Sequence, residues 1–162
     1  MYTRIGQNLK SNIYQKLEKE DVTLFEILEE DDVIIESKQQ NTKLISFFSK
    51  KEILSEIIKI ITIPFQKDKF LKENNNNENE KNEDEILSYI SKMSGRFPQI
   101  ITDILLIDNC PLIDIISKDE ELLDLFFYFF KEKNAKPNFE QNWIKILNRL
   151  FNSKPGNVQF FL

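Results

Sequence analysis

Glycine and proline are scarce in this sequence, and their scarcity most constrains the fold. The 162 residues include only 3 Gly and 5 Pro. A β-sandwich or β-barrel needs a turn about every 8 to 12 residues, and these two residue types supply many such turns. The composition therefore favours helices. Since the length is typical of one domain, we expect a single helical-repeat domain over residues 1–162.

Apolar residues recur at helical spacing along most of the chain. We expect helices over about Asn8 to Lys19, Leu24 to Leu28, Asp31 or Asp32 to Phe48, Lys50 to Ile63, Glu85 to Lys92, Pro98 to Leu106, a short segment opened by Pro111, Asp119 to Lys131 and Asn138 to Asn152. The segment from Asp119 is apolar on nearly all sides, which predicts neighbours on two sides.

Several residues mark where these helices begin and end. Capping boxes, in which a hydroxyl precedes a carboxylate by three positions, are predicted at Thr23, Ser49 and Ser117. Gly95 is interpreted as a left-handed C-cap, and Pro98 suits the first turn of the next helix. These signals predict a chain of short, separately capped helices.

A polar segment interrupts the helical pattern. Residues 73–85 read ENNNNENEKNEDE and contain no apolar side chain. Since such a segment buries nothing that offsets the entropy of ordering, residues 66–84 are predicted to form a flexible Asn/Glu-rich loop between helix pairs. The asparagine run is interpreted as low-complexity filler.

The succession of short helices predicts an all-α, antiparallel helical-repeat array of the HEAT or armadillo type. The apolar residues Val158 to Leu162 resume a helical start without a polar closing element, so the chain is interpreted as the N-terminal fragment of a longer solenoid. No exact internal repeat is visible. A closed helical bundle is the structural alternative.

The residues that most enzymes use are missing. The sequence has no histidine, which removes the commonest general base, the serine triad and most zinc sites. Glycine-rich phosphate loops are also absent. Cys110 has no histidine to activate it and is interpreted as a half-buried structural thiol. The acidic run Glu29 to Asp32 lacks the spacing of a calcium loop. We therefore expect no enzymatic activity, no catalytic residue, no metal site and no cofactor.

Net charge and hydropathy limit the classes of partner that we expect. The formal net charge is −5, which disfavours nucleic acid and anionic membranes as partners. Lysines and phenylalanines alternate near Phe65 to Phe70, but neighbouring acidic residues cancel most of that field. No stretch approaches the about 18 apolar residues of a membrane span, and a single cysteine excludes an internal disulfide. These features favour a cytoplasmic location.

One polar stretch, Glu36 to Leu44, interrupts the helix expected to run to Phe48. Amides and charges on a rigid helix suit the recognition of a protein partner. A solvated helix face explains the same pattern, and the residues alone leave both interpretations open.

The same stretch resembles a known family. Residues that match in order and spacing are Glu20-Asp21-Val22-Thr23-Leu24, Glu30, Asp32-Val33, Glu36, Lys38, Gln40-Asn41 and Lys43-Leu44-Ile45. They resemble the N-terminal motif of the SAPS family, the regulatory subunits of protein phosphatase 6. Further matches are Phe97-Pro98, Asp119 to Leu123, Pro137 ahead of Trp143, and Lys154-Pro155. Departures are Ser37 at a common cysteine position, Thr102-Asp103 for a usual Cys-Glu, and an insertion at Asn74 to Asp84.

The resemblance implies a non-catalytic subunit. Such a subunit binds the catalytic subunit of a protein phosphatase 6-type Ser/Thr phosphatase and directs its substrate choice, in the cytoplasm or also in the nucleus. An ankyrin-repeat subunit is an additional expected partner, through regions beyond this chain. The polar positions of the motif become the candidate partner contacts: Asp32, Glu36, Lys38, Gln40, Asn41 and Lys43. The alternative function is a self-associating helical scaffold or trafficking adaptor without a phosphatase partner.

Overall fold

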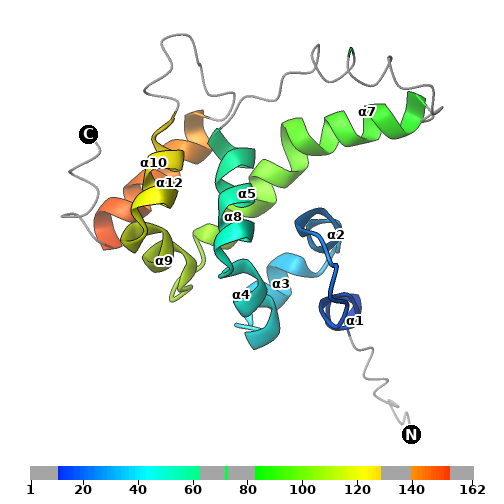
Figure 1. The fold of residues 1–162 in the computed structure, drawn as a ribbon, viewed down its shortest axis with the longest axis horizontal. Coiled ribbons are helices and arrows are strands. Elements are labelled where there is room, and N and C mark those ends of the chain that lie inside the picture. The colour runs from blue at the N-terminus through cyan, green and yellow to red at the C-terminus, as the bar shows by residue number, and fades with distance from the viewer. Residues whose placement is uncertain (1–10, 63–71, 73–82, 129–139, 154–162) are drawn as a thin grey trace, which may run out of the picture.

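The structure is a computed structural model that describes residues 11–62, 72, 83–128 and 140–153, and its elements are all helical (Figure 1). In chain order they are α1 (Asn12–Leu17), α2 (Leu24–Leu28), α3 (Val33–Lys38), α4 (Thr42–Phe48), α5 (Lys51–Thr62), α7 (Glu83–Ser91), the π-helical turn η1 (Lys92–Arg96), α8 (Phe97–Leu105), α9 (Leu112–Lys118), α10 (Glu120–Phe126) and α12 (Glu140–Ser153). The all-α class predicted from the sequence is confirmed for these residues, and the arrangement is consistent with a helical-repeat array.

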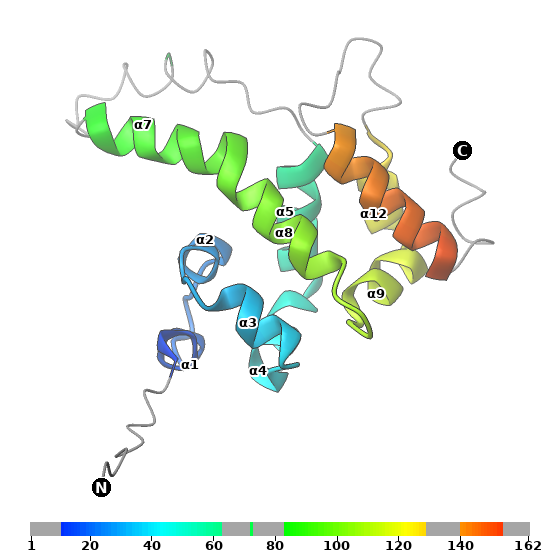
Figure 2. The ribbon, with the colours of Figure 1, turned by 180° about the vertical axis from the view of Figure 1, so that it is seen from behind.

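Helix α8 lies at the centre of the packing. It contacts α3, α5 and α12, and Figure 2 shows it crossing the middle of the molecule. Seven of its nine residues are buried, with Gln99 and Asp103 exposed. A helix buried on nearly all sides needs neighbours around it. Helix α10, for which two-sided cover was predicted, does pack on both α5 and α9, while its acidic residues Glu120, Glu121 and Asp124 remain exposed.

The core is one contiguous cluster of buried side chains, extending from Ile13 in α1 to Leu150 in α12. Its aromatic part joins α10 to α12. The rings of Phe126 and Trp143 stack with centroids 5.2 Å apart, and Phe127 meets Trp143 edge-on at 6.1 Å. The indole Nε1 of Trp143 also donates a hydrogen bond to the Phe126 carbonyl oxygen at 3.3 Å. Trp143 therefore combines apolar packing with a satisfied polar atom.

The chain does not break at Gly95, so the C-cap predicted there is wrong. No glycine in the described residues has a positive φ; instead α7 runs through η1 into α8 as one rod (Figure 2). In η1 the Phe97 N–H donates to the Lys92 carbonyl, five residues back. Pro98 lacks a donor and its ring would clash with a carbonyl in a normal turn. The wider π-helical turn accommodates Pro98 without ending the helix.

Of the three predicted capping boxes, only that at Thr23 forms. The Thr23 hydroxyl accepts from the Glu26 N–H, and the Glu26 carboxylate accepts from the Thr23 N–H at 2.9 Å. The hydrogen bonds from the Thr23 backbone and then its hydroxyl lower the pKa of Glu26. The hydroxyls of Ser49 and Ser117 instead donate to the carbonyls of Ile45 and Asp114.

Asp119 caps α10 in place of Ser117, because its carboxylate accepts from the N–H groups of Glu121 and Leu122 at 3.0 and 3.2 Å. A carboxylate at this position satisfies free donors and complements the positive end of the helix. The capping box predicted at Ser117 is therefore wrong, and the residue directly before the helix is the cap.

Other expected boundaries agree closely where the structure describes them. Helix α5 matches the span predicted to end before Pro64, and α9 follows Pro111 as expected. Most of the predicted 66–84 loop lies outside the described residues, and its last two residues already belong to α7. Residues 8–10, 129–131, 138–139 and 158–162, for which helices were also predicted, lie outside them as well.

Candidate partner-binding surface

The polar stretch between Glu36 and Leu44 is a turn between two helices. A single helix to Phe48 was predicted, and that prediction is wrong: α3 ends at Lys38 and α4 begins at Thr42. Gln40 has a left-handed backbone with φ of 57°. The Asn41 N–H donates to the Glu36 carbonyl and the Gln40 N–H to the Ser37 carbonyl, both at 3.1 Å. This pair of bonds is the Schellman motif, with Gln40 where glycine is usual.

Asn41 holds the turn closed. Its side chain is only 7% exposed; Oδ1 accepts from the Leu44 N–H at 3.2 Å and so caps α4. Its Nδ2 donates to Glu36 Oε2 at 2.8 Å, which ties the cap of α4 back to α3. Asn41 and Glu36 therefore use their polar groups within the chain, which identifies them as positioning residues.

Asp32 also points to a neighbour within the chain. Its carboxylate accepts a hydrogen bond from the Ser11 hydroxyl, and the same hydroxyl caps α1 by accepting from the Ile13 N–H at 3.3 Å. Asp32 precedes α3 but makes no side-chain cap to that helix. It links the start of α1 to the start of α3 and stabilises the position of the motif.

The remaining three predicted contacts are exposed to solvent. Lys38 and Gln40 are exposed, and within the described part of the chain their side chains have no hydrogen-bond or ion-pair partner. Lys43 is 57% exposed and pairs with Glu18 of the segment after α1 at 3.7 Å. The structure therefore divides the six residues into three whose side chains bond within the chain and three that a partner protein can reach.

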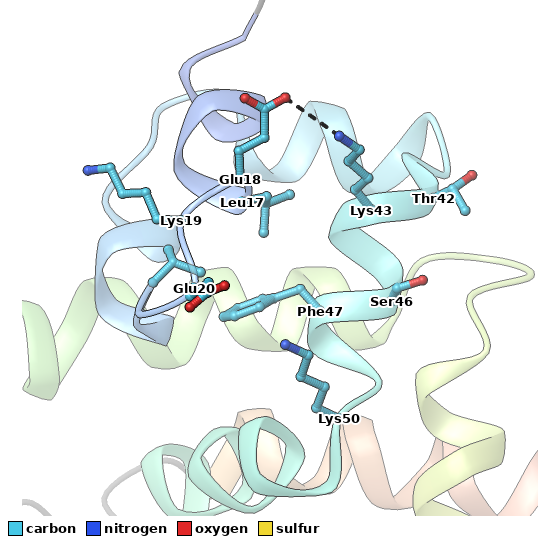
Figure 3. A pocket seen from close by; sticks show the side chains of 10 residues that line it. Leu17, Glu18, Lys19, Glu20, Thr42, Lys43, Ser46, Phe47 and Lys50 are labelled. Carbon is cyan, nitrogen blue, oxygen red and sulfur yellow. Dashed lines mark ion pairs between the residues drawn. The ribbon is translucent and has the colours of Figure 1, made fainter.

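Beside Lys43 lies a groove between the α1–α2 connection and α4 (Figure 3). Its volume is about 610 Å³, and its lining residues are Leu17, Glu18, Lys19, Glu20, Val22, Thr42, Lys43, Ser46, Phe47 and Lys50. The Nζ of Lys50 lies 5.5 Å from the centroid of the Phe47 ring, which is cation–π range. Among these lining residues, only Lys43 was predicted from the sequence as a partner contact.

Comparison with known proteins gives relatives over the whole chain. The chain is 29% identical to serine/threonine-protein phosphatase 6 regulatory subunit 3 of Gallus gallus. It is 27% identical to regulatory subunit 2 of Homo sapiens and 26% identical to regulatory subunit 1 of Mus musculus. That agreement supports SAPS family membership. The chain spans only 15 to 17% of the length of these relatives. No family model and no solved structure matches the chain.

Two of the positions at which the chain departs from the SAPS pattern are buried and fully accommodated. Ser37 and Thr102 are both 0% exposed. Their hydroxyls donate to the carbonyls four residues earlier, those of Val33 and Pro98, each at 2.7 Å. A small polar side chain can replace a buried cysteine when such a bond satisfies it.

The described residues contain no group of three His, Cys, Asp or Glu side chains placed to hold a metal ion. No helix among them is both long and apolar enough to cross a membrane. Cys110 is buried, and burial is the main cause that raises the pKa of its thiol. Cys110 was predicted to be half-buried and is buried more deeply, at 9% exposed, and a raised pKa makes the thiol less reactive.

Proposed function

We propose that this chain is part of a non-catalytic regulatory subunit that binds the catalytic subunit of a protein phosphatase 6-type Ser/Thr phosphatase and directs its substrate choice. The observation that carries the proposal is the similarity along the entire chain to proteins named as regulatory subunits of that phosphatase. In this proposal the dephosphorylation chemistry belongs to the partner, and the chain itself is not an enzyme.

The contact surface in this proposal is smaller than the sequence motif. Lys38, Gln40 and Lys43 contact the partner, since they are exposed on the α3–α4 corner. Glu36 and Asn41 hold that corner through their internal hydrogen bonds, and Asp32 ties the start of α3 to Ser11. The motif thus combines a rigid support with a few reachable side chains, which lowers the entropy lost on binding.

Capture of a purified phosphatase 6 catalytic subunit by the immobilised chain tests the proposal. We expect Lys43→Glu to reduce capture about fivefold or more, because a reversed charge at an interface opposes association. Lys145→Glu is the matched control, since Lys145 is an exposed lysine on α12, remote in sequence from the corner. Both variants should melt within about 2 °C of the wild type, as surface substitutions usually do.

Failure of the wild-type chain to capture the catalytic subunit would contradict the proposal. Equal loss of capture in both variants would contradict the assignment of Lys43 while leaving the partner in place. A defined homo-oligomer together with absent capture would favour the scaffold or adaptor function instead, and light scattering measures that state.

The cytoplasmic or nuclear location and the ankyrin-repeat partner belong to the same proposal. Imaging of the tagged full-length protein tests the location, and exclusion from both compartments contradicts it. Co-purification with the full-length protein tests the ankyrin-repeat partner, which this proposal places beyond the residues of this chain.

A further inference from the structure

The charged residues on the α4 side of the groove are all lysines. Residues 37–51 contain four lysines and no acidic residue, although the chain as a whole has a net charge of −5. Among the groove residues, α4 contributes Lys43 and the α4–α5 connection contributes Lys50, whereas the α1–α2 connection contributes Glu18, Lys19 and Glu20. The α4 side of the groove is therefore positive within an acidic molecule.

These lysines flank an aromatic ring. Figure 3 shows Lys43 and Lys50 on opposite sides of Phe47, with Lys19 extending away from the ring. Lys51, the next lysine along the chain, is already engaged with Asp119 and Glu121 at 3.1 and 2.6 Å. Lys43 and Lys50 are thus the cations of this stretch that remain at the groove. Its apolar lining consists of the half-buried Leu17 and Val22 and of Phe47, which is only 5% exposed.

Glu18 supplies the carboxylate that currently meets Lys43. Their charged atoms are 3.7 Å apart, and the two side chains are 57% and 68% exposed. An exposed pair of this kind changes an equilibrium only about 1.5- to 5-fold. An incoming carboxylate therefore displaces Glu18 from Lys43 at small cost. The other acid, Glu20, lies on the α1–α2 side of the Phe47 ring (Figure 3).

We propose that this groove binds an acidic segment of a protein partner. An apolar side chain of that segment packs on Leu17 and Val22, which are half-buried beside the buried Phe47 ring, and its carboxylates pair with Lys43 and Lys50 in place of Glu18. The proposal deepens the proposed function, because it names the chemistry of the docking segment. It rests on that function only for the identity of the partner as a phosphatase subunit.

Peptide selection tests the groove without the phosphatase. The probe is a library of random 12-residue peptides displayed on phage and selected against the full chain. We expect enriched peptides to carry at least two acidic residues beside an aromatic or branched apolar residue. An enriched peptide, labelled with fluorescein, is then measured by anisotropy against the wild type, Lys43→Gln, Lys50→Gln, Glu18→Gln and the remote control Lys145→Gln.

The lysine variants and the Glu18 variant should change peptide affinity in opposite directions. Lys43→Gln and Lys50→Gln should each weaken binding about 2- to 10-fold, and Glu18→Gln should tighten it about 1.5- to 5-fold, because the competing carboxylate is gone. Lys145→Gln should leave affinity unchanged, and binding should weaken as salt rises. Selection of non-acidic peptides, or weaker binding by Glu18→Gln, overturns the proposal. Acidic peptide binding without capture of the phosphatase subunit overturns only the proposed function.

Discussion

Replacement of Asn41 distinguishes the residues that hold the α3–α4 corner in place from those that contact the partner protein. Asn41 makes two internal bonds: the cap to the Leu44 N–H and the bridge to Glu36. Loss of an N-cap costs about 1 kcal/mol, and we assign the half-exposed bridge about 1 kcal/mol, below the usual range for charged hydrogen bonds because water replaces part of it. Asn41→Ala should therefore lower the free energy of unfolding by about 2 kcal/mol.

Asn41→Ser is the matched comparison, because serine keeps a capping oxygen but cannot reach Glu36 as the amide does. We expect it to lose about 1 kcal/mol, which is roughly half the loss of Asn41→Ala. Urea unfolding followed by circular dichroism at 222 nm measures both differences. For a chain of this length the alanine variant should also melt about 4 to 8 °C lower.

The result that refutes this reasoning is equally specific. If Asn41→Ala loses less than about 0.5 kcal/mol, the cap and bridge do not support the corner as the hydrogen-bond energies require. If Asn41→Ala abolishes capture of the phosphatase subunit at full stability, Asn41 is a contact and its assignment as a positioning residue is wrong. Lys43→Glu should show the converse behaviour, with reduced capture and unchanged stability.

Three further predictions concern other parts of the fold. Gln40→Gly should raise the free energy of unfolding by about 0.5 to 1 kcal/mol in urea titrations, since glycine tolerates a positive φ. Asn109→Gly, at φ of 60°, should raise the free energy of unfolding less, because asparagine tolerates that region. A lower free energy of unfolding for Gln40→Gly would contradict the turn assignment. The hydrogen bonds that lower the pKa of Glu26 stabilise its charged form, so their contribution is present at neutral pH and is lost as pH falls through the folded-state pKa; Thr23→Ala should raise that pKa only partly in an NMR titration, because the backbone N–H remains, and an unchanged pKa would exclude the hydroxyl as a cause. Trp143→Ala should cost about 3 to 5 kcal/mol by urea unfolding, because it removes the ring stacked on Phe126, and a loss below 1 kcal/mol would show that the α10–α12 contact is dispensable.

Helix periodicity was sufficient to predict the class and most helix spans. The stripe from Ile53 to Ile61 and the stop at Pro64 predicted α5 closely, because apolar burial on one face and a missing donor act locally. The cap at Thr23 was predictable for the same reason. Prediction of a cap from local sequence is less certain where two nearby residues can cap the same helix, as Ser117 and Asp119 can.

The errors at Gln40 and Gly95 have a common physical cause. Gln40 adopts a left-handed conformation that its side chain disfavours, because the Schellman bonds and the Asn41 cap hold it there. Gly95 stays helical although it is free to turn, because the backbone hydrogen bond from Phe97 to Lys92 spans it. Hydrogen bonds between neighbouring residues outweighed the intrinsic preference of each residue. The presence of four lysines and no acidic residue in residues 37–51 is visible in the sequence, but only the fold places Lys43 and Lys50 at one groove.

The π-helical turn determines how side chains at the two ends of the rod are oriented around its axis. Tyr89 and Phe97 are eight positions apart, which places them about 80° from each other around an ordinary α-helix. The extra residue absorbed by η1 removes about 100° of rotation, so both rings come to face the same way. Phe25 of α2 meets both, with centroid distances of 6.2 Å to Tyr89 and 5.8 Å to Phe97. The additional residue thus acts as a rotational adjustment that lets one aromatic side chain of α2 bind both halves of the rod.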